Sequence, residues 1–282
     1  MNIKTSTILY IFAQLLVLQA VAPRAVCQQP LKPQTARDFE CYIQSAEARM
    51  EARKAFLLAD SDGALNEQLV RGQKIMTVPG SGPNPHKITG GQLYDWIGTV
   101  FVPGGKADRT VRMLQDYDHR TQYLGEIVSS SKLLCRKGDG HFAYAMRLKE
   151  PAVIDTENDV VWTQVDPQRW RCRSYSTKMQ EVGKDHRYVQ RVYSYWRVAQ
   201  ADEGVYIEAE YITLSGEFGS FVRAIGSMMG INPEKTLKRT LTLLREADLK
   251  PGLEFAAPAT GVPECGEPFR PAGCQAPATT DN

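Results

Sequence analysis

Near the N-terminus, apolar residues recur at the three- and four-residue spacing of an amphipathic helix. The spacing predicts a helix over residues 36–58, with Glu and Arg side chains on the opposite face. Thr35 and Asp38 fit a capping box at its start. The Gly- and Pro-rich residues 78–91 predict a loop that separates this helix from the main domain. The apolar stripe of the helix comprises Phe39, Ile43, Ala46, Met50 and Leu57.

From Trp96 onward, short strand-like runs alternate with turn residues. A strand that starts at Trp96 ends at Pro103-Gly104, and residues 106–124 have helical spacing. Six more strands follow with no helix between them, which predicts an antiparallel sheet. These strands are expected over residues 126–136, 140–149, 152–165, 168–182, 187–201 and 205–215.

Helical periodicity returns after the last strand. Asn232 and Pro233 are a favourable cap and first helical residue for a C-terminal helix that carries Leu237, Leu241 and Leu244. After Asp248 the composition turns to Pro, Ala and Gly, which predicts a disordered tail. A further apolar stripe precedes Asn232 and consists of Phe218, Phe221, Val222, Ile225, Met228 and Met229.

The predicted order is a strand, a helix, six antiparallel strands and a long C-terminal helix, which is the order of the helix-grip fold. The stretches "YDWIGTVFVPGG", "LQDYDHRTQYLGEIVSSSKL", "SYWRV" and "DEGVYIEAEYITLS" resemble START-like proteins, a superfamily that also includes polyketide cyclases and lipid carriers. The closest resemblance is to a bacterial, exported branch. It covers roughly residues 90–247. It implies an α+β fold in which a curved antiparallel sheet of about seven strands wraps around the C-terminal helix and encloses a cavity.

The domain organisation follows from these elements. We expect a signal peptide at residues 1–27 and an N-terminal helix with its linker at 28–90. A START-like domain should span 91–248, and a Pro/Ala-rich tail 249–282.

Two strands around a tight turn, residues 193–215, carry the candidate site residues. Alternation places Trp196 and Val198 on one face of their strand, and Ile207, Ala209 and Tyr211 on one face of the next. A two-residue turn at Glu203-Gly204 would set Arg197 opposite Glu210 and Trp196 opposite Tyr211. A three-residue turn that includes Asp202 is the alternative. We favour the first, because it keeps apolar residues together and pairs opposite charges.

The apolar face of this hairpin is expected to lie under the C-terminal helix, with Arg197, Glu208 and Glu210 outside in water. The alternative places Arg197 and Glu210 inside, as a buried pair that orients a polar ligand group. Met228 and Met229 would form an adaptable cavity wall, or equally a packed core. Together with the cavity that the resemblance implies, the predicted ligand-binding residues are Trp196, Val198, Ile207, Tyr211, Phe221, Ile225, Met228 and Met229.

The apolar run from Ile8 to Ala22 is short for a membrane span and fits a signal peptide cleaved before Gln28, so the protein is expected to be exported, to the periplasm or outside the cell. An uncleaved N-terminal anchor stays an alternative. Without Cys27, five cysteines remain. The best predicted disulfide is Cys265–Cys274, with Cys135 and Cys172 as buried free thiols and the pairing of Cys41 open.

Composition narrows the function classes. The net charge of +2 and the scattered basic residues argue against nucleic-acid binding. The histidines are far apart in sequence and there are no paired C-x-x-C motifs, which argues against a metal-binding site. The sequence also contains no cofactor-binding motif and no nucleophile motif. His119 is a candidate base beside Asp118, but we favour a solvated surface histidine.

The leading hypothesis is a monomeric, non-catalytic protein that binds a hydrophobic or amphipathic small molecule, with peripheral membrane contact left open. One alternative is a cyclase- or hydrolase-type enzyme that uses Arg197, Glu208, Glu210 or a tyrosine. The other is an envelope module in which the N-terminal helix or the tail holds a protein partner.

Overall fold

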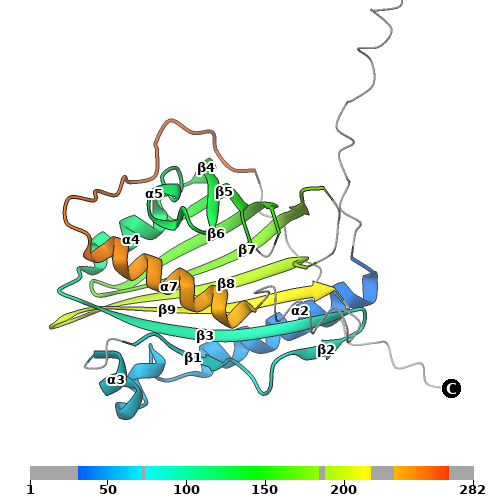
Figure 1. Ribbon diagram of the computed structural model, residues 1–282, viewed down its shortest axis with the longest axis horizontal. Coiled ribbons are helices and arrows are strands. Elements are labelled where there is room, and N and C mark those ends of the chain that lie inside the picture. The colour runs from blue at the N-terminus through cyan, green and yellow to red at the C-terminus, as the bar shows by residue number, and fades with distance from the viewer. Residues whose placement is uncertain (1–30, 71–73, 151, 184–187, 217–231, 267–282) are drawn as a thin grey trace, which may run out of the picture.

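The computed structural model describes residues 31–70, 74–150, 152–183, 188–216 and 232–266. One large antiparallel sheet with helices on its two sides makes up the structure, so the predicted α+β helix-grip fold is confirmed (Figure 1). The helices are α2 (Pro33–Ala52), α3 (Gly63–Val70), α4 (Ala107–Gln115), α5 (Thr121–Leu124) and α7 (Pro233–Leu249), with a short 3-10 helix, η2, at Leu58–Asp60. The strands are β1 (Met76–Pro79), β2 (His86–Ile88), β3 (Gly91–Pro103), β4 (Val128–Lys137), β5 (His141–Leu148), β6 (Ile154–Asp166), β7 (Arg169–Glu181), β8 (Arg191–Ala201) and β9 (Gly204–Gly216).

The sheet order is β1-β3-β9-β8-β7-β6-β5-β4, and β2 pairs with the start of β3. Strands β4 to β9 form a continuous meander, which confirms the six predicted strands. The loop predicted at 78–91 instead contributes two short strands, because β1 and β2 pair with the outer edge of β3. Pro79 is compatible with this position, since an edge strand has an outward side on which no N–H is needed.

Helix α7 packs against one face of the sheet and is the long C-terminal helix of the helix-grip fold (Figure 1). The predicted cap is confirmed, since the Asn232 side chain accepts hydrogen bonds from the backbone N–H groups of Glu234 (3.0 Å) and Lys235 (3.3 Å). Gly98 of β3 lets the helix approach closely, because a Cβ there would lie 2.7 Å from Leu241 Cδ1. Leu237, Leu241 and Leu244 of this helix pack in one core with Val198, Ile207 and Ala209 of the sheet.

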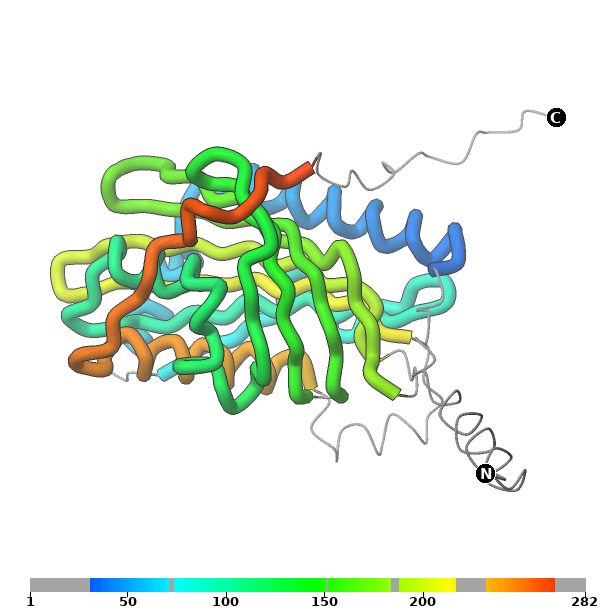
Figure 2. Tube along the Cα trace, turned by 90° about the horizontal axis from the view of Figure 1, so that it is seen from above, coloured from blue at the N-terminus to red at the C-terminus, as the bar shows by residue number. Residues whose placement is uncertain are grey.

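Helix α2 covers the opposite face of the sheet, as the two views in Figures 1 and 2 show. It begins at Pro33 with Lys32 as its cap residue, so the predicted capping box at Thr35 and Asp38 is wrong. Thr35 is buried within the helix, and Asp38 instead accepts a hydrogen bond from the backbone of Thr89 at 3.2 Å. Phe39, Ile43 and Ala46 of the predicted stripe are buried in a second core, whereas Leu57 lies after the end of α2 in a third cluster. The sheet contributes Leu93, Tyr175, Tyr193, Tyr195, Ile212 and Leu214 to the second core.

The described segment after α7 packs against the core, in contrast to the predicted disordered tail. Phe255 packs edge-on against Tyr123, with ring centroids 5.6 Å apart, and the Arg109 guanidinium lies 4.7 Å from the Phe255 ring. Further along, the backbone of Arg136 in β4 exchanges hydrogen bonds with Pro263 and Cys265. The Pro, Ala and Gly content of this segment predicts disorder, but a few apolar residues, such as Phe255, pack it against the core.

The cysteine pairing differs from the prediction. Cys265 forms a disulfide with Cys135 of β4, not with Cys274, which lies outside the described residues. Cys135 is therefore not a free thiol, whereas Cys172 is free and buried, as predicted. Cys41 is also disulfide-bonded. None of the helices in the described part of the chain is long and apolar enough to cross a membrane.

The Cys135–Cys265 disulfide should contribute substantially to stability. It joins residues 130 positions apart, so its loss frees a long loop in the unfolded chain. We expect the double variant Cys135→Ser/Cys265→Ser to lose about 2–4 kcal/mol in its free energy of unfolding, measured by urea titration without reductant. With reductant, wild type and variant should converge. If wild type and the double variant are equally stable without reductant as well as with it, the stabilising role of the Cys135–Cys265 disulfide is contradicted.

Candidate functional site

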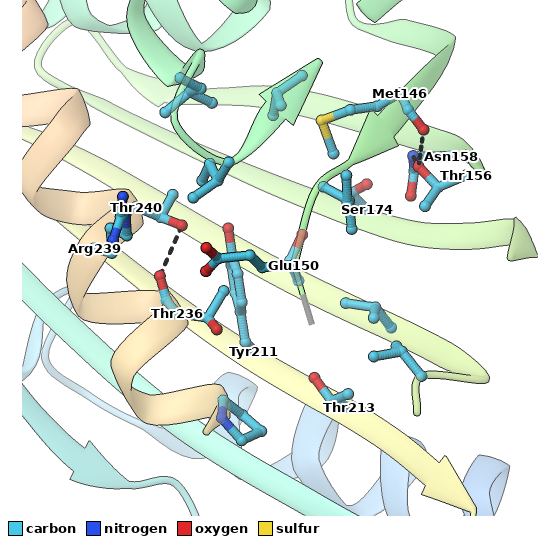
Figure 3. Close-up of a pocket in the computed structure, with 18 of the residues that line it drawn as sticks. Met146, Glu150, Thr156, Asn158, Ser174, Tyr211, Thr213, Thr236, Arg239 and Thr240 are labelled. Carbon is cyan, nitrogen blue, oxygen red and sulfur yellow. Dashed lines mark hydrogen bonds between the residues drawn. The ribbon is translucent and has the colours of Figure 1, made fainter. Parts of the chain in front are cut away.

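A cavity of about 980 Å³ lies between α7 and the sheet face that α7 covers (Figure 3). This volume is at the upper end of the range for small-molecule sites, about 300–1,000 Å³. Strands β3 to β9, helices α4, α5 and α7 and the segment around Tyr117 contribute to its walls. Its apolar and aromatic lining includes Trp96, Leu114, Tyr117, Leu124, Ile127, Val128, Tyr144, Met146, Leu148, Trp162, Trp196, Tyr211 and Leu243.

The lining of the cavity changes from aromatic to small polar side chains along the strands. Trp162 of β6, Cys172 of β7 and Trp196 of β8 are paired neighbours, so two tryptophans flank a cysteine in a row across the sheet. Farther along, Val192 of β8 pairs with Thr213 of β9, in a region where small polar side chains replace aromatic ones. Alternate residues of each strand point into the cavity, so this change arises from the period-two pattern of the strands. The hydroxyl-bearing lining comprises Thr156, Ser174, Ser194, Thr213, Ser215, Thr236 and Thr240, several of which are labelled in Figure 3.

At the aromatic end, Arg120 lies against two stacked tyrosines. The rings of Tyr117 and Tyr144 are 4.7 Å apart, and the Arg120 guanidinium carbon lies 4.8 Å and 4.5 Å from their respective centroids. The Tyr117 hydroxyl accepts a hydrogen bond from Trp162 Nε1 at 3.0 Å, which fixes its ring. Arg120 Nη2 donates to the Leu114 carbonyl at 2.9 Å. The cation is therefore placed by cation–π contacts and one backbone acceptor.

The titratable groups of the aromatic end are electrically neutral apart from this arginine. Burial raises the pKa of Tyr117 and of Tyr211 above their ordinary values. Burial likewise raises the pKa of the Cys172 thiol. Cys172 therefore stays protonated at physiological pH and lacks the thiolate character of a nucleophile.

The predicted ligand-binding residues separate into three groups. Trp196 and Tyr211 both line the cavity, with their rings edge to face at 5.6 Å. Val198 and Ile207 are fully buried in the core and are not part of the cavity wall. The other four, Phe221, Ile225, Met228 and Met229, lie outside the described residues.

The turn of the β8–β9 hairpin lies one residue earlier than predicted. Asp202 and Glu203 form it, so Arg197 pairs with Glu208 and not with Glu210. Gly204 belongs to the strand, where β9 approaches β3 so closely that a Cβ would lie 2.2 Å from the Val102 carbonyl oxygen. The register moves by two residues, which preserves the two faces. The apolar set therefore faces α7, as predicted.

The charged face of the hairpin is not in water, contrary to our expectation. Glu208 and Glu210 are 1% and 2% exposed, because α2 and the segment after it cover them. Glu208 accepts hydrogen bonds from Arg53 (2.6 Å), Arg197 (3.3 Å) and the backbone N–H of Leu58 (2.7 Å). The predicted inside pair of Arg197 and Glu210 is also absent, since both lie on the face opposite the cavity.

Glu210 belongs to a second buried network, with Asp95 of β3. Arg49 of α2 forms ion pairs with both carboxylates, and the Tyr42 hydroxyl donates to Asp95 at 2.9 Å. Burial and the neighbouring Asp95 raise the pKa of Glu210 to about 8, against the opposing effect of Arg49. Burial also raises the pKa of Asp95. The two carboxyl groups therefore retain a proton at neutral pH.

These carboxylates cannot act on a molecule in the cavity, because the sheet separates them from it. His119 is half-exposed and binds Asp116, at 2.7 Å, while Asp118 accepts the backbone N–H of Leu133. Within the described ranges, no cluster of three His, Cys, Asp or Glu residues is arranged to hold a metal ion. Sequence reasoning missed Arg120, although it considered the adjacent histidine in "YDHR".

Neither a protein-family model nor a curated protein matches the chain. Among solved structures, a STAR-related lipid transfer protein from Xanthomonas axonopodis is 17% identical, with 58% of this chain and 97% of that chain covered and a TM-score of 0.44. Human STARD10 is 11% identical, with coverage of 67% and 78% and a TM-score of 0.40. Norcoclaurine synthase from Thalictrum flavum is 13% identical, with coverage of 58% and 98% and a TM-score of 0.38. The START-like fold that the sequence predicts agrees with the element order of the structure itself, in which six antiparallel strands precede the C-terminal helix.

The network beneath α2 should make stability depend on pH. Because the pKa of Glu210 is raised from 4.5 to about 8, the folded protein binds more protons than the unfolded chain between these values. Stability from this group is complete below pH 4.5 and is lost as pH rises to about 8. One extra bound proton gives a slope of at most about 1.4 kcal/mol per pH unit.

Urea unfolding across this pH range tests the assignment. Glu210→Gln should flatten the fall in stability, whereas Glu157→Gln, which alters a half-exposed carboxylate, should keep it. If the free energies of unfolding of Glu210→Gln and wild type have the same pH dependence, Glu210 is not the group responsible.

Proposed function

We propose that this protein binds a hydrophobic or amphipathic small molecule in the cavity between α7 and the sheet, without transforming it. The observation that carries the proposal is the cavity itself, which has a volume of about 980 Å³ and is walled mainly by aromatic and aliphatic side chains. Its scattered hydroxyl groups can orient a ligand, because a few placed polar groups are what gives an apolar pocket its specificity.

The absence of catalysis in this proposal rests on the chemistry of the groups that reach the cavity. Cys172 and the buried tyrosines are held in their neutral forms by burial. The buried carboxylates Asp95, Glu208 and Glu210 are on the far side of the sheet and bind arginines there. These groups therefore provide a bound molecule with neither a nucleophile nor a base of shifted pKa.

Export to the periplasm or the cell exterior is part of the same proposal. Its support is the apolar segment from Ile8 to Ala22 and the disulfide between Cys135 and Cys265. Disulfides persist in oxidising compartments and are rare in the cytosol. A small-molecule carrier outside the cytoplasm is consistent with both features.

Filling the cavity should abolish binding. Ser174 is buried and lines the cavity, so Ser174→Phe places a ring in the ligand volume (Figure 3). We expect dodecanol, dodecanoate or dodecyl phosphate to change the fluorescence of wild type, because Trp96, Trp162 and Trp196 line the cavity. The affinity of at least one of these probes should fall more than about tenfold in the variant.

The matched control is Val161→Phe, on the exposed face of β6, where the side chain is 42% exposed. This variant should bind as wild type does. Mass spectrometry of molecules that copurify with wild type provides an independent readout. A protein that binds no probe and copurifies with nothing, or a Ser174→Phe variant that binds normally, would refute the proposal.

A further inference from the structure

Arg120 differs from every other charged residue of the described cavity lining. The others lie at the rim with exposed side chains, and two of them, Glu126 and Arg239, form an ion pair there at 2.6 Å. Arg120 instead lies among Tyr117, Tyr123 and Tyr144 at the aromatic end. The remaining rim residues are Glu150, Lys235 and Glu246.

The Arg120 guanidinium has no anionic partner in the described chain. Nη2 donates to the Leu114 carbonyl, the Tyr123 hydroxyl is a further hydrogen-bonding neighbour, and Nε is buried without any partner. The two nearest acids in sequence are already engaged: Asp118 accepts from the backbone N–H of Leu133, and Asp116 binds His119 and the backbone N–H of Ala256. A guanidinium is always protonated in proteins, so this end of the cavity carries a full positive charge.

Two tyrosine hydroxyls in the same cavity are also without partners. Tyr144 and Tyr211 both line it, and neither hydroxyl forms a hydrogen bond within the part of the chain that the structure describes. In Figure 3 the Tyr211 side chain extends into the cavity. An arginine flanked by free hydroxyl donors is a typical arrangement for a carboxylate or a phosphate, because charge-assisted hydrogen bonds are the strongest available.

We propose that Arg120 is the specificity-determining residue of the cavity and binds the anionic head group of an amphipathic ligand, a carboxylate or a phosphate. The Tyr144 and Tyr211 hydroxyls donate further hydrogen bonds to the same group. The apolar remainder of the ligand contacts Val128, Met146 and Leu243, which line the same cavity. This inference rests on the proposed function and adds the charge of the ligand.

The test uses ligands that share one alkyl chain and differ in their head group. Dodecanoate, dodecyl phosphate, dodecanol and dodecyltrimethylammonium are titrated at neutral pH, with tryptophan fluorescence and calorimetry as readouts. Wild type should bind one or both anions about ten- to a hundredfold more tightly than the alcohol, the range for a hydrogen bond to a charged group. The comparison of dodecanoate with dodecyl phosphate identifies the head group.

Variants at Arg120 decide whether this residue is responsible. Arg120→Gln should lose the preference for anions over dodecanol, and Arg120→Lys should keep part of it. The control is Arg112→Gln, which removes an exposed cation of α4 and should keep the full preference. Thermal unfolding verifies that each variant is folded.

The outcomes separate the two proposals. Equal binding of anions and alcohol by wild type, or an anion preference that survives in Arg120→Gln, overturns the role of Arg120 while the binding function stands. Tighter binding of the ammonium compound also overturns it. If none of the four compounds binds, the binding function fails and the role of Arg120 fails with it.

Discussion

The structure depends on the burial of both faces of β9 and its neighbours. Successive residues of a strand point to opposite sides, so β9 must satisfy two different environments at once. Val205, Ile207 and Ala209 face the core under α7, while Glu208 and Glu210 face α2. A register error of one residue would exchange these sets. The observed register differs from the predicted one by two residues, which leaves the sets in place.

Buried carboxylates on the outer face require α2 to be more than a hydrophobic cover. Arg49 and Arg53 supply cations to Glu210 and Glu208, respectively, and the segment after the helix supplies a backbone N–H. Removing only one member of such a set leaves a buried charge without compensation, which is costly. The second core, around Phe39 and Ile43, and these ion pairs therefore stabilise the same docked position of the helix.

Local signals predicted what depends on neighbours in sequence. Strand alternation identified the faces of β8 and β9, and the Asn232-Pro233 pair identified the start of α7. Contacts between distant segments were not predictable in this way. Arg49 and Glu210 are 161 residues apart, and the Cys135–Cys265 disulfide joins positions 130 apart in sequence. Arg120 was missed because the sequence predicts one helix over residues 106–124, whereas α4 ends at Gln115 and α5 begins at Thr121, which leaves Arg120 between them.

The distribution of charge across the sheet gives the cavity its chemical character. On the outer face, the buried carboxylates of Glu208 and Glu210 meet arginines from α2, so charges of both signs are present. On the inner face, Arg120 meets neutral tyrosines and a neutral thiol, which cannot balance its charge. Cation–π contacts and one carbonyl offset only part of the cost of burying a cation. The inner face is therefore the side on which we propose that the anionic group of a ligand binds.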